Sequence, residues 1–296
     1  MNCKYCKSEN IVKHGVRAGL QHYLCKNCNH HFHDNTNSLP TMRNNSIIIV
    51  NSLNLYYSGL SRRKVREQIE NIYGKSVSQT IIHYWVHKYA TLVKDYVATL
   101  QPKLSGKYHH DETEIKVDAE GRYFWETINQ NTRFIVAHLL SEDRTSEEAT
   151  KVFKQALEKQ RPIAFFTDGS FSYAKAFNKV FWSNFKASKV EWVRKVGIRD
   201  RETNQIIERK HSTFKMRYKV MRGLKNDESS KELIDGYITD YNYCRQHQSI
   251  KKTPAQEAGL DVKGWKQFIE NAHAHNINKE IQNKKEVEEP IKVKSK

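Results

Sequence analysis

The sequence predicts an α/β fold for the second half of the chain, preceded by two small modules, and three observations lead to this prediction. Strand-like segments dominate residues 105–141 and are followed by alternating helical and strand-like segments. Helical periodicity with capping residues marks residues 44–96, and two closely spaced cysteine pairs precede it. A chain of 296 residues has room for about two domains of ordinary size, so such a division is physically reasonable.

The chain carries a large excess of positive charge. Its 50 lysines and arginines outnumber 33 acidic residues and give a net charge of +17, although 38% of residues are hydrophobic. This composition indicates a folded basic protein that attracts a polyanion, either nucleic acid or an anionic membrane surface. No apolar run approaches the ~20 residues of a membrane span, and no signal peptide is visible. We therefore expect a nucleic-acid partner in a cytoplasmic, nucleoid-associated setting.

The positive charge is concentrated in two stretches. Residues 1–105 contain 14 basic and 5 acidic residues, and residues 201–225 contain 8 basic and 2 acidic residues. The segment between them is nearly balanced by comparison. This distribution predicts a basic binding module at the front, a core in the middle, and a second basic strip behind it.

Four cysteines near the N-terminus form two pairs, with two residues inside each pair and eighteen between them: Cys3, Cys6, Cys25 and Cys28. A pair with this spacing binds one metal from a tight turn, and two such turns complete a tetrahedral thiolate site for Zn²⁺. Disulfide bonds are the alternative, but nothing in the chain points to secretion. We predict a zinc ribbon over residues 1–38 with one structural Zn²⁺. Cys244 is interpreted as an ordinary packed thiol.

Three helical segments follow, separated by Gly59 and Gly74: residues 44–58, 62–72 and 79–96. Ser61 and Ser78 precede the second and third segments as N-caps. This pattern predicts a helix-turn-helix domain over residues 42–100.

In a helix-turn-helix, the third helix enters the major groove and the second contacts phosphates. The predicted contacts from the third helix are Gln79, Thr80, His83 and Lys88. Those from the second are Arg62, Arg63, Lys64 and Arg66. The alternative is a helical bundle in which these charged residues form only a solvated face.

The segment from Tyr108 onward has the pattern of a three-stranded meander with turns near residues 118–121 and 129–131. A helix beginning near Ser146, a short apolar strand ending at Asp168 and another helix follow. This order is that of a ribonuclease H-like α/β layer. We predict such a core, a mixed sheet with flanking helices, over residues 105–260.

The remaining residues, 261–296, are predicted to form a last helix around 264–275 and then a disordered tail from Lys279. The tail is interpreted in this way because it is highly charged and low in complexity.

Two acidic residues on the predicted strands lie where they could bind a ligand or take part in catalysis. Asp111 shares a face of the first strand with Thr113, whereas Glu112 and Glu114 share the other face. Asp168 lies where a buried strand ends, which is the usual place for ligands in an α/β sheet. Taken alone, Asp168 is also compatible with an ordinary residue at the point where a strand ends and a turn begins.

A third carboxylate, Glu208, lies on a predicted helix with His211 and Lys215 on the same stripe. Burying unpaired carboxylates costs several kcal/mol, so carboxylates converging from two strands and a helix require a divalent cation. Such an all-oxygen site suits two Mg²⁺ ions about 3.5–4 Å apart and in-line displacement at phosphorus. Glu208 taken alone is also compatible with a surface residue paired with a lysine.

The motifs of this region, taken together, resemble those of a known family. They are HHDETEIKV, RTSEEA, FFTDGSFSY, NQIIERKHSTFKMRYKVMRGL and YNYCRQHQSIKKTPAQEAGL. This series resembles the DDE transposases of bacterial and archaeal insertion sequences, nearest to the insertion-sequence-six group. The resemblance extends from the helix-turn-helix segments GLSRRKV and VSQTIIHYWV to Leu260. Many members of that group lack the zinc ribbon, and HH before Asp111 replaces a more apolar lead-in.

The resemblance implies that Asp111, Asp168 and Glu208 are the catalytic carboxylates and bind two Mg²⁺ or Mn²⁺ ions. It also implies cleavage of DNA at element ends, transfer of the 3′-hydroxyls into target DNA, and a homodimer or larger assembly on paired ends. The alternatives are a transposase-derived DNA-binding regulator that no longer cuts and a nuclease of the same fold.

The second basic strip then has an expected role, which is to hold the phosphates of DNA entering the metal site. The predicted DNA contacts of this strip are Arg209, Lys210, His211, Lys215, Arg217 and Arg222, with Lys219 and Lys225 beside them. For His211, two interpretations stay open: a contact to DNA or the scissile phosphate, and simple packing beside Glu208.

Overall fold

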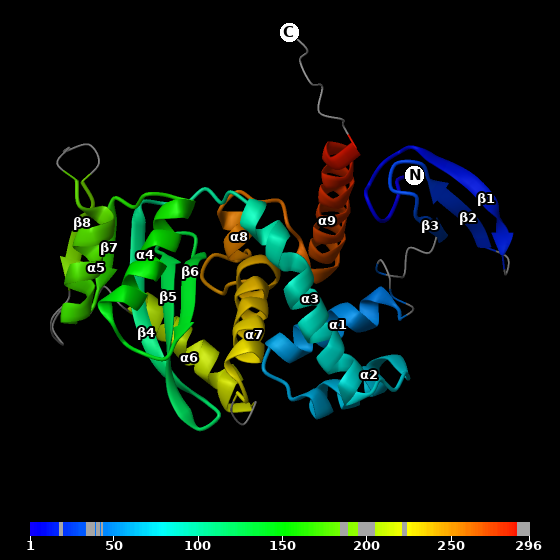
Figure 1. The fold of residues 1–296 in the computed structure, drawn as a ribbon. Helices are drawn as coiled ribbons and strands as arrows, with labels where there is room; N and C mark the ends of the chain where they lie inside the picture. Colours follow the sequence, from blue (N-terminus) through cyan, green and yellow to red (C-terminus); the bar gives the residue numbers. More distant parts are fainter. Residues whose placement is uncertain are drawn as a thin grey trace, which may run out of the picture.

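The computed structural model describes most of the chain: residues 1–17, 20–33, 39, 42, 44–183, 189–194, 205–220 and 224–288. Figure 1 shows a small N-terminal sheet, a group of helices, and a larger sheet with helices packed around it. Among the described residues, no helix combines the length and apolar character needed to cross a membrane.

The N-terminal sheet contains three antiparallel strands in sequence order: β1 (Ile11–Arg17), β2 (Leu20–Cys25) and β3 (His31–His33). Each cysteine pair is followed by one residue in the left-handed region, Lys7 at φ 62° and Asn29 at φ 57°. These residues close the tight turns that point both cysteines of a pair to one side. The predicted ribbon-like module therefore has its own sheet and its own turns.

The three predicted helices are present: α1 (Ser46–Tyr57), α2 (Arg62–Tyr73) and α3 (Gln79–Thr99). The Ser61 side chain accepts a hydrogen bond from the Lys64 amide, and that of Ser78 accepts one from the Ile81 amide, so both predicted caps are confirmed. Gly74 ends α2 in the left-handed conformation at φ 62°.

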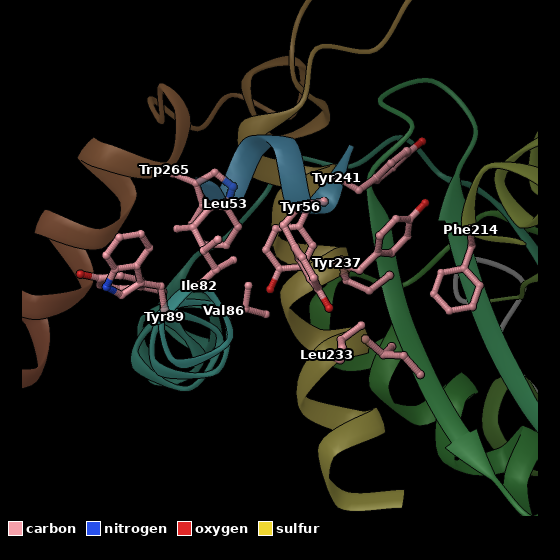
Figure 2. Close-up of a cluster of buried hydrophobic side chains, with 14 of the residues drawn as sticks. Leu53, Tyr56, Ile82, Val86, Tyr89, Phe214, Leu233, Tyr237, Tyr241 and Trp265 are labelled. Atoms are coloured by element: carbon pink, nitrogen blue, oxygen red, sulfur yellow. The ribbon is translucent and has the colours of Figure 1, made fainter. Parts of the chain in front are cut away.

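These helices share a core with the rest of the protein. Figure 2 shows Leu53 and Tyr56 from α1 and Ile82 from α3 beside Tyr237 and Trp265, which come from later in the chain. The later residues lie on α7 (Asp227–Thr239) and α9 (Gly264–Glu288). The helical module is thus fixed to the body of the protein by continuous apolar packing, and its boundary in sequence is not a boundary in the core.

The larger sheet has five strands: β4 (Lys107–Val117), β5 (Glu120–Asn129), β6 (Ile135–Ser141), β7 (Ala164–Thr167) and β8 (Glu191–Arg194). Their spatial order is β6-β5-β4-β7-β8. The first three strands form the predicted antiparallel meander, and β7 and β8 continue the sheet parallel to β4. This topology confirms the predicted ribonuclease H-like mixed sheet.

Helices cover both faces of this sheet. On one face, α4 (Ser146–Lys159) and α5 (Phe171–Phe181) bury an aromatic cluster that includes Phe153 and Tyr173. On the other face, α6 (Gln205–Val220) packs against β4 and β5 through Ile207 and Phe214. Residues alternate along β4, so one set of its side chains points to each helical layer.

The end of the α/β region is formed by short elements. A π-helical turn, η2 (Asp240–Cys244), continues α7, and α8 (Pro254–Glu257) follows it. Cys244 is partly buried and packs against both apolar clusters, as expected for an ordinary packed thiol.

The C-terminal prediction was wrong in one respect. Helix α9 does not stop near residue 275 but continues to Glu288, through the start of the segment predicted to be a disordered tail. Ile277 and Ile281 lie four residues apart on this helix and pack in the cluster that contains the cysteines. The tertiary contact explains the longer helix, because it supplies the buried apolar surface that the charged composition concealed.

Candidate active site

Asp111 lies in the middle of β4 and faces α6. Its Oδ2 atom is 3.6 Å from Nδ1 of His211 on that helix. Burial raises the pKa of Asp111 to about 8, and the charges of Glu112, Asp168 and Glu208 contribute to the same rise. The carboxylate is therefore held where its charged form is unfavourable unless a cation compensates it.

Asp168 follows the last residue of β7. The parallel register pairs Phe166 with His109, so Asp168 and Asp111 come two residues later on neighbouring strands. The Asp168 Oδ1 atom accepts a hydrogen bond of 2.8 Å from the Ser170 amide, which fixes the side chain in the turn before α5. The predicted position at the end of a buried strand is thereby confirmed.

Glu208 lies in the first turn of α6 and is exposed. Its negative charge is stabilised by the partial positive charge of the helix N-terminus. Because its charge acts on Asp111, the three predicted carboxylates lie in one electrostatic environment although they come from β4, the end of β7 and α6.

Glu112 is a further acidic residue at this site, and the sequence had given it no role. Its side chain is only 5% exposed and is in direct contact with Arg144. Burial raises the pKa of Glu112 to about 7, although the charge of Arg144 opposes the shift. The Arg144 Nη2 atom also lies 3.6 Å from Asp168 Oδ2, so this arginine joins the two carboxylates. The only sequence signal for it was its place in the RTSEEA motif.

Lys210 was predicted to contact DNA, and the structure places it elsewhere. The residue is 3% exposed, and its Nζ atom donates a hydrogen bond of 2.8 Å to Oε1 of the fully buried Glu126 on β5. The same ammonium lies 4.5 Å from the ring centre of Tyr237 and 4.8 Å from that of Tyr241. Lys210 therefore joins α6 to the sheet, and its charge is unavailable to phosphates.

His211 is buried between two carboxylates. Its Nε2 atom lies 3.4 Å from Glu126 Oε2, and its Nδ1 atom lies on the Asp111 side. Burial lowers the pKa of His211 to about 4. The structure places His211 against Asp111 and Glu126, and a contact to DNA or to the scissile phosphate stays a prediction.

The other members of the basic strip divide in the same way. Arg217 is buried, with its guanidinium 3.8 Å from the ring centre of Tyr56 and Nη1 donating to the Leu60 carbonyl, so its predicted DNA contact is also corrected. Arg209 and Lys215 are exposed on α6. Arg222 lies outside the described residues. The helical period explains the division, because residues 210 and 217 lie on the inward face of α6.

Of the predicted contacts of the helix-turn-helix, Lys88 is half-buried. The contacts that are exposed on α2 and α3 include Arg62, Arg63, Lys64, Arg66, Gln79 and Thr80. His83 is exposed as well, with its ring centre 4.3 Å from that of His87. Within α2, the Lys64 Nζ atom is 2.8 Å from Glu67 Oε2. An exposed pair of this kind is weak because water screens it, so it is readily exchanged for a phosphate. The DNA contacts of this module stay a prediction.

The four N-terminal cysteines form a compact group. Their sulfur atoms lie within 4.8 Å of one another, and no pair is joined in a disulfide. The distances are 3.7 Å between Cys3 and Cys28 and 3.6 Å between Cys6 and Cys25. Zn–S bonds of ~2.3 Å in a tetrahedron require sulfur separations of about 3.8 Å. The group therefore fits one Zn²⁺, in agreement with the predicted structural site.

The carboxylates of the larger domain offer a different donor set. Asp111, Asp168 and Glu208 supply only oxygen atoms, which suit Mg²⁺ or Mn²⁺. Within the described part of the chain, the cysteines alone bring three or more ligand atoms within 4.8 Å, so the carboxylates are more widely spaced. The buried Glu112 Oε2 atom has no hydrogen-bond partner, which also indicates a site that accepts positive charge.

The sheet order and the carboxylates on β4, after β7 and on α6 define an α/β domain of the ribonuclease H-like class with an acidic site. Residues 105–247 match the model of a transposase family described as the DDE domain. This segment is therefore similar to the DDE domain of that family. No curated protein matches the chain by sequence.

Several solved structures are similar to this chain at low sequence identity. The catalytic core domain of HTLV-2 integrase in complex with magnesium, in its trimeric form, is 14% identical with a TM-score of 0.42, covering 54% of this chain and 98% of the integrase chain. The simian T-cell lymphotropic virus intasome in complex with the PP2A regulatory subunit B56 gamma is 12% identical with a TM-score of 0.43. The match covers 70% of this chain and 74% of the intasome chain. The catalytic core domain of BIV integrase is 13% identical with a TM-score of 0.38. The match covers 51% of this chain and 92% of the integrase chain.

Proposed function

We propose that this protein is a DDE transposase that binds insertion-sequence ends, cleaves DNA phosphodiesters and transfers the 3′-hydroxyl ends into target DNA. The observation that carries the proposal is the convergence of Asp111, Asp168 and Glu208 from three elements of a DDE domain. The burial of Asp111 and the repulsion between these carboxylates raise the pKa of Asp111 to about 8. Such a cluster is favourable only where cations bind, and the net charge of +17 supports DNA as the substrate.

In this proposal Asp111, Asp168 and Glu208 would hold two Mg²⁺ or Mn²⁺ ions, which would supply activation of the attacking oxygen and charge stabilisation at the leaving oxygen. The side chains of the protein supply orientation and charge. His211 packs against Asp111 and limits its movement, while the bond from Lys210 to Glu126 fixes the helix that carries Glu208. Arg144 is partly exposed beside Asp168 and offers a guanidinium to the non-bridging oxygens of the phosphate.

DNA recognition is assigned to the front of the chain. The zinc ribbon of residues 1–38 with one structural Zn²⁺ and the helix-turn-helix of residues 42–100 bind the element ends, and the catalytic domain of residues 105–260 acts on them. The exposure of Gln79, Thr80 and His83 on α3 supports this assignment. Pairing of two ends requires at least two copies of the chain, so we propose a homodimer or larger assembly in the cytoplasm.

The test is a gel assay with labelled element-end DNA, a target plasmid and Mg²⁺. The ends are taken from the sequences that flank the gene. Asp111→Asn, Asp168→Asn and Glu208→Gln each remove one carboxylate with little change in volume. We expect strand transfer to fall by at least a factor of about 10³ in each variant, as for loss of a group that acts in the transition state.

The matched control is Glu158→Gln, which removes an exposed carboxylate from α4. End binding is measured in parallel and is expected to stay within about twofold for all four variants. Unchanged transfer in one active-site variant contradicts the assignment of that residue. Cleavage without joining by the wild-type protein identifies a nuclease, and end binding without cleavage identifies a DNA-binding regulator.

A further inference from the structure

A cavity of about 560 Å³ lies along one side of α6. Its walls come from α6, the turn after β5, η2 and residues 246–249. Its volume is within the ~300–1,000 Å³ range of sites for small molecules and nucleotides. A double helix is far too wide for this space, whereas one unpaired nucleotide fits.

Three arginines line the cavity: Arg133, Arg209 and Arg245. None of them is within 4 Å of a carboxylate oxygen among the residues that the structure describes. The Nη1 atom of Arg133 is buried without a hydrogen-bond partner. We call this cavity the arginine pocket.

The acidic residues near the arginine pocket have hydrogen-bond partners outside it. The carboxylate of Asp240 accepts a hydrogen bond of 2.8 Å from Trp265 Nε1, and that of Glu126 is bonded to Lys210. Burial lowers the pKa of Arg133, and the nearby charge of Arg209 lowers it further. The arginines therefore repel one another, and an anion bound between them would offset this repulsion and the desolvation of Arg133.

The backbone holds Arg133 in this place. It has a positive φ of 61°, in the left-handed region that is uncommon for a residue with a side chain. The preceding turn is closed by Asn129, whose Oδ1 atom accepts hydrogen bonds of 3.0 Å and 2.9 Å from the amide and hydroxyl of Thr132. A strained residue held by a well-bonded turn is typical of a ligand site.

The remaining walls match the other parts of a nucleotide. His247 and Tyr241 contribute rings whose centroids are 6.2 Å apart, and aromatic rings bind bases of any sequence. Three glutamines, Gln205, Gln246 and Gln248, offer both donors and acceptors to base edges. Inorganic phosphate would use only the arginines.

We propose that the arginine pocket binds one unpaired nucleotide of a DNA strand, with its phosphate on the arginines and its base against His247 and the glutamine amides. This inference rests on the proposed transposase function and deepens it. Arg209, which lines the arginine pocket, directly follows Glu208 in the sequence of α6. The DNA bound in this way must be locally unpaired.

The test measures DNA binding by the full chain in EDTA, where no chemistry takes place. The probes are a fluorescein-labelled ten-nucleotide thymidine oligomer and a duplex of equal length. The variant combines Arg209→Gln and Arg245→Gln, two residues that line the pocket and are exposed. The matched control is Lys154→Gln on α4, outside the pocket.

We expect the double variant to bind the single strand at least tenfold more weakly, while binding of the duplex changes by less than threefold. The slope of log affinity against log salt should become shallower by about 0.7 for each phosphate that the variant no longer neutralises. Deoxythymidine monophosphate should compete with the oligomer at least tenfold better than inorganic phosphate.

Equal affinity of the double variant and the control for the single strand overturns the proposal. Equal loss for single strand and duplex, or equal competition by phosphate and the nucleotide, overturns the assignment to an unpaired nucleotide. The strand-transfer assay fails separately if the proposed function is wrong, because the binding assay needs neither cations nor cleavage.

Discussion

Lys210 provides a sharp test of how the fold uses its basic residues. Its Nζ atom is buried beside Glu126, which is itself 0% exposed. The substitution Lys210→Met keeps the length and the apolar stem of the side chain but removes the charge. Glu126 then stays in the protein interior with His211 as its nearest polar neighbour.

Removing one partner of a buried ion pair costs about 3–5 kcal/mol, because it leaves an uncompensated charge in a poorly solvated place. We expect a loss of this size in the free energy of unfolding of Lys210→Met. The double variant Glu126→Gln with Lys210→Met removes both charges and should recover at least about 2 kcal/mol of the loss.

The assay is urea denaturation followed by tryptophan fluorescence, together with a DNA-binding titration. Lys215→Met is the matched control, since Lys215 is exposed on the same helix. We expect the control to lose less than about 0.5 kcal/mol of stability but some DNA affinity. If Lys210→Met is as stable as the control and loses as much DNA affinity, Lys210 faces the DNA and the buried ion pair is wrong.

Two further predictions concern ionisation and metal binding. In EDTA, Asp111→Asn should become more stable relative to the wild type by about 2 kcal/mol between pH 6 and pH 8. The sign follows from the raised folded-state pKa of about 8, because the contribution of Asp111 to stability is present at low pH and is lost as the pH rises through that value. Denaturation curves at the two pH values check this, and a pH-independent difference contradicts it. For the cysteine group, atomic absorption should find one zinc per chain in the wild type and none in Cys6→Ser. Full zinc content in that variant would show that the metal binds elsewhere.

Much of the fold could be predicted from local patterns. The meander from Tyr108, the caps Ser61 and Ser78 and the strand before Asp168 are all signalled by residues close in sequence. Hydrogen-bonded caps and alternating strands depend on neighbours within a few positions, so a single sequence contains the necessary information. The helix beyond residue 279 was missed because its stability comes from contact with the cysteine module, far away in the chain.

The candidate site could be predicted only in part. Asp111, Asp168 and Glu208 could be predicted because motifs in a familiar order carry them, and their catalytic role stays a prediction. Glu112, Arg144 and Glu126 were missed, since their significance depends on contacts with side chains from other elements: Arg144 with Glu112 and Asp168, and Glu126 with Lys210 and His211.

The sequence by itself determined the cysteine spacing and the predictions of the module order and of three catalytic carboxylates, because each depends on residue type and short-range periodicity. Only the tertiary structure decided which basic residues of the strip are free to meet a phosphate. Lys210 and Arg217 are as basic as Arg209, but burial against Glu126 and Tyr56 uses their charges to hold α6 in place. The physical reason is desolvation, since a charge removed from water must be satisfied by the groups packed around it, and those groups come from distant parts of the chain.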